Sequence, residues 1–204
     1  MNLRPLLPRL LLASLAGALA GGLLAHMLTQ SAVTLQGGSA LPRPRVIAPF
    51  TLTDTEGRQL RNDALHGHPT LLYFGFTACP DVCPATLAVL RELRTRAPLP
   101  DLRMWFVTVD PERDTPEALR QYLSAFGPGF TGLRAEAGAL DPLLHEFSAF
   151  AGKREQPGVQ YSVDHSATLF LLDSRAQLVA VFSPPLQATV LDADLRKLAG
   201  KGLL

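Results

Sequence analysis

A strand, a helix and a second strand follow one another in the middle of the chain, and this pattern constrains the fold more than any other feature. Residues 70–76, TLLYFGF, are a continuous apolar run, which is typical of a strand covered on both faces. Residues 85–96 carry leucines at helical spacing with arginines between them, which predicts an amphipathic helix. Residues 102–109, LRMWFVTV, predict the next strand. Strands joined by such a crossover run parallel, so the sequence predicts an α/β fold.

Weaker patterns on either side predict the remaining elements. A hairpin is predicted over residues 50–60, with its turn at Glu56-Gly57. Further helices are predicted at residues 116–126, 139–150 and 188–198, and strands at 167–172 and 178–182. Thr115 as cap and Pro116 at the first helical position mark one helix start. This order predicts a thioredoxin-like fold, with a central mixed sheet flanked by helices and a helical insertion between its halves.

The first 28 residues have the pattern of a membrane segment. Residues 10–28 contain no Lys, Arg, Asp or Glu, and their length is close to the ~20 residues that cross a bilayer. Arg4 and Arg9 precede this run, and positive residues stay on the cytoplasmic side. We therefore predict an N-terminal transmembrane helix that anchors the chain in the bacterial inner membrane, with its soluble domain in the periplasm. Ala18-Leu19-Ala20 could serve as a cleavage site, so a cleaved signal peptide is the alternative.

The remaining chain divides into a short linker and one domain. Residues 29–47 contain Gly, Ser and Pro without periodicity and are predicted to be a flexible tether. Residues 48–204 are predicted to form the folded domain, and a hydrophobic content of 47% is enough to build its core. The net charge is +1, from 19 basic and 18 acidic residues, which gives no indication of a nucleic-acid partner.

Both cysteines lie in the segment CPDVCP, directly after the predicted central strand. The carboxyl ends of strands are where open α/β sheets build their sites. Pro84 suits the first helical position, which makes Cys83 the expected cap residue and a reactive thiolate. With three residues between them, the thiolates of Cys79 and Cys83 can bind one soft ion such as copper(I) or zinc.

A metal held by two cysteines needs at least one further ligand. The chain has five histidines, at positions 26, 66, 68, 145 and 165. Four of them lie in the predicted membrane segment, at the far end of the central strand, or within a predicted helix. His165 precedes the strand at residue 167, on a loop that could reach the cysteines. It is therefore the preferred third ligand.

The residues alone leave several interpretations of the cysteine pair open. A structural disulfide is one, although such a short loop contributes little chain-entropy stabilisation. A dithiol oxidoreductase is another, although the common redox motif has two residues between its cysteines. A zinc site would lack a convincing fourth ligand. Two cysteines and one histidine suit copper best, in a low-coordinate or trigonal site.

Three segments in this order resemble the Sco/SenC family of membrane-tethered copper-binding proteins that assist cytochrome c oxidase assembly. They are FGFTACPDVCPATL, FVTVDPERDTPEALRQYLSAF and YSVDHSATLFLLD, and the resemblance covers about residues 48–198. It implies a thioredoxin-like fold and copper ligands at Cys79, Cys83 and His165, for Cu(I), Cu(II) or both.

The same resemblance implies two alternative tasks. As a metallochaperone, the protein would deliver copper to the binuclear site of cytochrome c oxidase subunit II, and other copper chaperones are further expected partners. As a thiol-disulfide oxidoreductase, it would reduce the cysteines of that site through Cys79 and Cys83. A sensor function has no positive support in the sequence.

Two acidic residues are candidates for roles around the ligands. Asp164 directly precedes His165 and could orient its imidazole as a hydrogen-bond acceptor. Asp110 precedes Pro111 and is interpreted either as a residue behind the ligands or as a loop cap.

Overall fold

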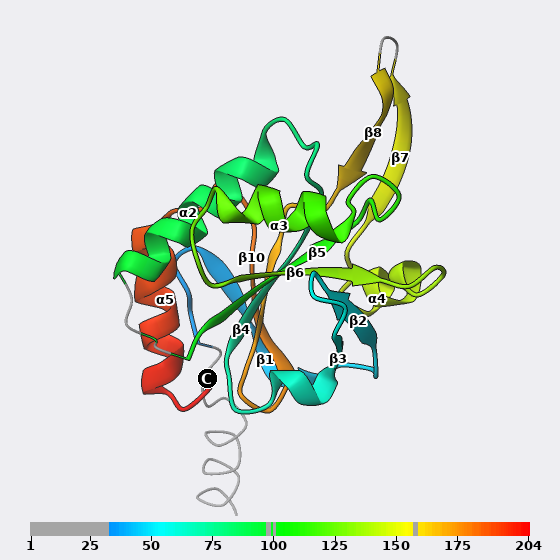
Figure 1. Ribbon diagram of the computed structural model, residues 1–204. Helices are drawn as coiled ribbons and strands as arrows, with labels where there is room; N and C mark the ends of the chain where they lie inside the picture. The colour runs from blue at the N-terminus through cyan, green and yellow to red at the C-terminus, as the bar shows by residue number, and fades with distance from the viewer. Residues whose placement is uncertain (1–32, 97–98, 100, 157–158) are drawn as a thin grey trace, which may run out of the picture. The chain divides into compact units, whose positions relative to one another are not determined.

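The computed structural model describes residues 33–96, 99, 101–156 and 159–204, which form an α/β domain (Figure 1). Its strands are β1 (Gly38–Val46), β2 (Thr51–Asp54), β3 (Gln59–Arg61), β4 (Thr70–Gly75), β5 (Arg103–Thr108), β6 (Phe130–Ala135), β7 (Ala151–Gln156), β8 (Val159–His165), β9 (Leu169–Leu172) and β10 (Gln177–Phe182). Its helices are the 3-10 helix η1 (Asn62–Leu65), α2 (Val82–Arg96), α3 (Pro116–Ser124), α4 (Leu140–Glu146) and α5 (Ala188–Gly200).

Eight of the strands form one mixed sheet in the order β1-β10-β9-β4-β5-β6-β2-β3. The pairs β4–β5 and β5–β6 are parallel, whereas the other pairs are antiparallel. All six residues of β4 are buried, as its apolar sequence predicted. The predicted strand-helix-strand unit, the following β9–β10 hairpin and the last helix are all confirmed, and with them the central mixed sheet flanked by helices.

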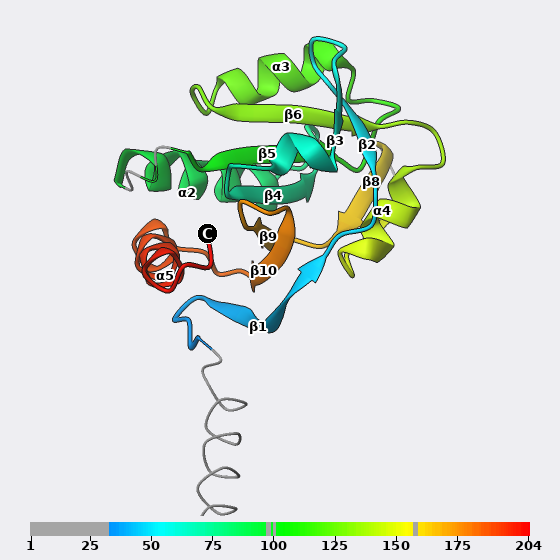
Figure 2. The same cartoon turned by 90° about the horizontal axis from the view of Figure 1, so that it is seen from below.

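Aromatic side chains fill the core on both faces of this sheet. On one face, the rings of Tyr73 and Phe106 lie 6.0 Å apart, and Phe106 also contacts α3. Helices α2 and α5 pack together on the same face (Figure 2). On the opposite face, beside α4, Phe74, Phe147 and Phe170 pack edge to face with centroids 5.2–5.8 Å apart. The core therefore holds the carboxyl end of β4 from both sides.

The structure corrects the predicted tether over residues 29–47, because residues 38–46 form β1 at the sheet edge. The Gly and Pro content obscured this strand. Its two prolines fall between Ala40 and Arg45, where the pairing with β10 shifts register, and edge strands tolerate proline because one side of their backbone is unpaired. Asp194 of α5 fixes the approach to β1, since its carboxylate accepts the backbone N–H groups of Gln36 and Gly37, each at 2.8 Å.

Two further parts of the fold were not predicted from the sequence. β6 extends the parallel part of the sheet, and β7 and β8 form a separate two-stranded hairpin. The predicted membrane segment, residues 1–28, lies outside the described residues. No helix among the residues that are described is long and apolar enough to span a bilayer.

Candidate metal centre

The loop that carries the two cysteines connects β4 to α2. Helix α2 begins at Val82, so Cys79 precedes the helix and Cys83 lies in its first turn. The predicted start at Pro84 is therefore two residues too late. Proline is tolerated throughout the first helical turn, where backbone N–H groups have no intrahelical partner. The first turn closes through the N–H of Ala85, which donates to the carbonyl of Asp81 at 3.2 Å.

Gly75, the last residue of β4, makes room for one of the sulfurs. A Cβ atom at this position would lie 2.9 Å from Cys83 Sγ and 2.8 Å from the ring of Phe106. Such separations are shorter than carbon and sulfur atoms allow, so any larger residue would displace the thiol. The glycine therefore lets α2 bring Cys83 directly against the end of the central strand.

His165 completes a cluster of three soft donors. Its Nε2 lies 3.3 Å from Cys83 Sγ, and the donor atoms of Cys79, Cys83 and His165 all lie within 4.8 Å of one another. Metal–sulfur bonds are about 2.3 Å long, so two donors on opposite sides of one ion are about 4.6 Å apart. The span and the donor chemistry both fit a single soft metal ion. Among the residues described, this is the one group of Cys, His, Asp or Glu side chains that converges in this way.

Neighbouring groups orient the imidazole. Nδ1 of His165 lies 3.0 Å from the carbonyl of Ser166, and a proton on Nδ1 donates to that oxygen and leaves Nε2 free to bind metal. The rings of Tyr73 and Phe76 contact the imidazole edge-on, at centroid distances of 6.1 and 5.5 Å. Asp164 does not orient His165, contrary to the prediction from sequence. Its carboxylate is exposed and lies 3.2 Å from Arg154, because neighbouring strand residues point to opposite faces.

The pKa values of the two thiols are shifted in opposite directions. The hydrogen bond from Cys83, followed by contacts with His165 and backbone N–H groups, holds the pKa of Cys79 well below its usual value despite partial burial. The same pairing with Cys79, together with burial, raises the pKa of Cys83. Cys83 is fully buried, whereas Cys79 keeps 9% of its surface exposed. The directions of these shifts and the complete burial of Cys83 favour Cys79, and not the predicted Cys83, as the reactive thiolate.

The other described histidines lie away from this cluster. His66 and His68 flank the turn before β4, at the end of that strand opposite the cysteines, and His145 is exposed on α4. These placements agree with the sequence argument that selected His165. One detail differs, since His165 is the last residue of β8 and not a loop residue.

Sequence reasoning missed a buried carboxylate behind the cysteine loop. Asp114 is fully buried and accepts hydrogen bonds from the backbone N–H of Thr77 at 3.0 Å and from its hydroxyl at 2.6 Å. Thr77 lies two residues before Cys79. The segment DPERD was visible in the sequence, but a partner so distant along the chain could not be identified from it.

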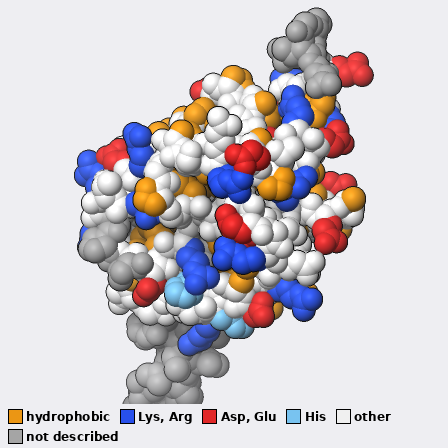
Figure 3. Space-filling view, viewed as in Figure 1, with side chains coloured by type: hydrophobic (Ala, Val, Ile, Leu, Met, Phe, Trp, Pro, Cys, Tyr) orange, Lys and Arg blue, Asp and Glu red, His pale blue; other side chains and the backbone are white. Residues whose placement is uncertain are grey.

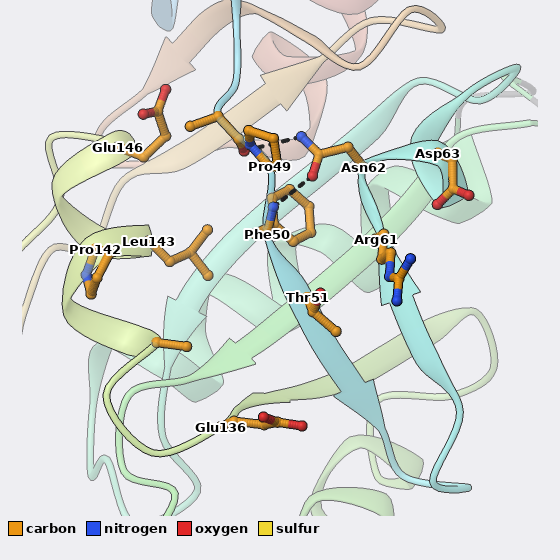
Figure 4. Close-up of a pocket in the computed structure, with 12 residues that line it drawn as sticks. Pro49, Phe50, Thr51, Arg61, Asn62, Asp63, Glu136, Pro142, Leu143 and Glu146 are labelled. Carbon is orange, nitrogen blue, oxygen red and sulfur yellow. Dashed lines mark hydrogen bonds between the residues drawn. The ribbon is translucent and has the colours of Figure 1, made fainter.

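A separate pocket lies between α4 and the β2–β3 hairpin. Its volume is about 720 Å³, and its lining includes Phe50, Asn62 and Leu143 (Figure 4). Asn62 supports its wall, since its side chain accepts the N–H of Phe50 at 2.8 Å. None of the three metal-ligand candidates lines this pocket.

On the face seen in Figure 3, basic and acidic side chains lie interspersed.

The fold and the cluster define an α/β protein with a soft-metal or thiol site at the carboxyl end of its central strand. The SCO1/SenC family model matches residues 38–200. The chain belongs to this family, which confirms the resemblance seen in the sequence.

Relatives of known sequence and structure support this assignment. The chain is 34% identical over 143 residues to a SCO2-like protein of Rickettsia prowazekii, covering 68% of this chain and 69% of that protein. Copper-bound ScoI of Bradyrhizobium japonicum is 34% identical with a TM-score of 0.68, covering 74% of this chain and 98% of that one. Apo Sco1 of Thermus thermophilus is 35% identical with a TM-score of 0.72, covering 82% and 99%. Cys79, Cys83 and His165 thus form the candidate copper site of a thioredoxin-like Sco protein.

Proposed function

We propose that this protein is a copper chaperone that carries one copper ion on Cys79, Cys83 and His165. The observation that carries the proposal is the convergence of two sulfurs and one imidazole nitrogen within 4.8 Å. Soft thiolates select copper(I), and imidazole adds the nitrogen donor that copper(II) prefers. Copper in the related ScoI structure supports the same cargo here.

The arrangement suits transfer better than permanent storage. Three protein donors leave a coordination position open, and Cys79 keeps 9% of its surface exposed while Cys83 is fully buried. An incoming thiolate of an acceptor can therefore approach copper before the chaperone ligands leave. Cys79 and His165 lie on different elements, the loop before α2 and the end of β8, so they can release the ion separately.

The proposed acceptor is the binuclear copper site of cytochrome c oxidase subunit II, and other copper chaperones are the proposed donors. We further propose that residues 1–28 anchor the chain in the bacterial inner membrane and place the domain in the periplasm. The charge pattern of that segment and membership of the SCO1/SenC family support both proposals. A domain on that side of the membrane would face an exported acceptor.

Cells that lack this chain should lose most of their copper-dependent oxidase activity, because its acceptor would not receive metal. Re-expression of the full chain should restore activity, and protease added to spheroplasts should degrade the domain. Oxidase activity, measured together with immunodetection of the protein, checks both expectations. Normal activity in the deleted strain would contradict the delivery proposal, and a protected domain would contradict the topology. A mature form beginning at Gly21 would indicate a cleaved signal peptide.

A second candidate function is reduction of the acceptor's cysteines, and the lowered pKa of Cys79 favours it. The Cys79 thiolate would attack one sulfur of the acceptor disulfide and release the other as a thiolate. Cys83, once deprotonated, would then attack Cys79 Sγ, release the second acceptor thiolate and close the Cys79–Cys83 disulfide. The acceptor gains two electrons and the pair loses two, so the exchange balances.

Alkylation with iodoacetamide should modify Cys79 first and should depend weakly on pH. A lowered pKa keeps the thiolate present far below neutrality, so the rate should change little between about pH 8 and pH 6. An ordinary thiol, with a pKa near 8.5, would react about tenfold more slowly per pH unit over that range. Mass spectrometry of quenched samples identifies the modified cysteine, and Cys79→Ser is the control. Faster modification of Cys83, or a steep fall in rate with acidity, would contradict the assignment.

A further inference from the structure

The hairpin that carries His165 is not part of the main sheet. β7 and β8 pair only with each other among the described strands, and they project beyond the sheet (Figure 1). A lone two-stranded hairpin is at best marginally stable in water. Strand pairing alone therefore cannot hold His165 at a defined distance from the cysteines, and contacts between the hairpin and the domain must do so.

Lys153 of β7 forms an exposed ion pair with Glu112, and the more buried contacts are made by Tyr161, four residues before His165 on the same face of β8. Its hydroxyl donates to Oδ1 of the fully buried Asp110 at 2.7 Å. Arg113 pairs with the same carboxylate, donates to the Tyr161 carbonyl at 3.0 Å and stacks 3.9 Å from the centre of the ring. Burial and the bond to Asp110 raise the pKa of Tyr161 to about 12, so the hydroxyl remains a donor.

The cysteine loop is tied to the same segment of chain. Thr108 accepts the N–H of Asp110 at 3.0 Å, and its hydroxyl donates to Asp114 at 2.5 Å. Asp114 in turn holds Thr77, two residues before Cys79. Tyr161 on the hairpin therefore bonds to the Asp110 side chain, and the Asp110 backbone N–H is linked through Thr108 and Asp114 to Thr77 at the start of the cysteine loop.

We propose that residues 108–114 form a bracket that sets the separation between His165 and the two cysteines, with Tyr161 and Asp110 as positioning residues. The proposal rests on the proposed copper site and adds the device that brings its nitrogen and sulfur donors together. The bracket has two independent ends. Tyr161 fixes the hairpin, whereas Asp114 fixes the cysteine loop.

The two copper oxidation states differ in the ligands that they require. Two thiolates can hold copper(I) in a two-coordinate site, whereas copper(II) requires more ligands, including imidazole. Loss of the contact between Tyr161 and Asp110 should therefore weaken copper(II) binding and leave copper(I) binding nearly unchanged. The position of the hairpin, set by the bracket, therefore influences which copper oxidation state the protein binds more tightly.

Tyr161→Phe removes only the hydroxyl that donates to Asp110 and keeps the ring that stacks on Arg113. In the metal-free full chain, backbone amides of residues 161–165 should exchange with deuterium about tenfold faster, the factor expected for one hydrogen bond to a charged group. With copper(II), affinity should fall about tenfold and the thiolate charge-transfer band should shift, whereas copper(I) affinity should stay within about twofold.

Tyr122→Phe is the matched control, because the buried Tyr122 hydroxyl has no hydrogen-bond partner among the described residues. It should not change hairpin exchange. Asp110→Asn tests the other partner, and because its amide oxygen still accepts from Tyr161, it should give an intermediate increase in exchange.

Unchanged exchange in both Tyr161→Phe and Asp110→Asn would overturn the bracket. Equal acceleration in β4 and β8 would also overturn it, because that result indicates a general loss of stability. If the wild-type chain bound no copper while Tyr161→Phe still released the hairpin, the proposed copper function would fail and the mechanical role of Tyr161 would stand.

Discussion

Copper titration of the reduced wild-type chain is expected to saturate at one ion per monomer, and Cys79→Ser or Cys83→Ser should each abolish tight binding. The described residues contain one cluster of soft donors, and its two thiolates supply most of its preference for copper. A serine hydroxyl is a hard donor that stays protonated at neutral pH. The affinity loss should exceed the ~100-fold that removal of a group behind a ligand can cause.

Oxidation of the wild-type chain provides a test of the same ligands without any mutation. A Cys79–Cys83 disulfide leaves no thiolate to bind metal, so copper loading should require a reductant and recover when one is added. Equilibrium competition with a copper chelator measures both forms. Wild-type affinity in both serine variants, or equal affinity of oxidised and reduced protein, would show that the ligands are assigned incorrectly. The full chain is the appropriate sample, because a fragment beginning at Arg43 would lack the first half of β1.

Replacement of His165 with alanine is expected to affect the binding of the two copper oxidation states differently. The variant keeps both thiolates and should still bind copper(I), but copper(II) loses its nitrogen donor. Copper(II) affinity should fall by at least about 100-fold, and the thiolate charge-transfer absorption should disappear. The variant should also fail to restore oxidase activity in cells that lack the chain.

His145→Ala is the control, since His145 is exposed on α4 and not part of the metal cluster. It should behave as wild type in each of these measurements. An unchanged copper(II) spectrum in His165→Ala, or full oxidase activity from it, would favour the thiol-disulfide oxidoreductase. Disulfide exchange needs the two thiols and not the imidazole.

The sequence by itself determined the centre of the fold and the three ligand candidates. The run at residues 70–76 is typical of a buried strand, and the helical pattern after it predicted a parallel crossover, as the structure confirms. The spacing of Cys79 and Cys83 confined both sulfurs to one short loop. Position along the chain was then enough to prefer His165, because it directly precedes a predicted strand, on a segment that could reach the cysteines. These inferences depend on local periodicity and on the rules of sheet connection.

Only the tertiary structure decided how the two thiols differ in burial and in their contacts, and how His165 reaches the cysteines. The opposite pKa shifts of the pair depend first on the contact between the two sulfurs and on burial, and for Cys79 also on His165 from a distant part of the chain, none of which a local pattern reports. β1 was not predicted because an edge strand can contain prolines. The separate hairpin was not predicted because it is supported by Asp110, 51 residues before Tyr161. Local sequence encodes how the backbone pairs and turns, whereas side-chain partners distant along the chain become neighbours only when the whole domain has packed.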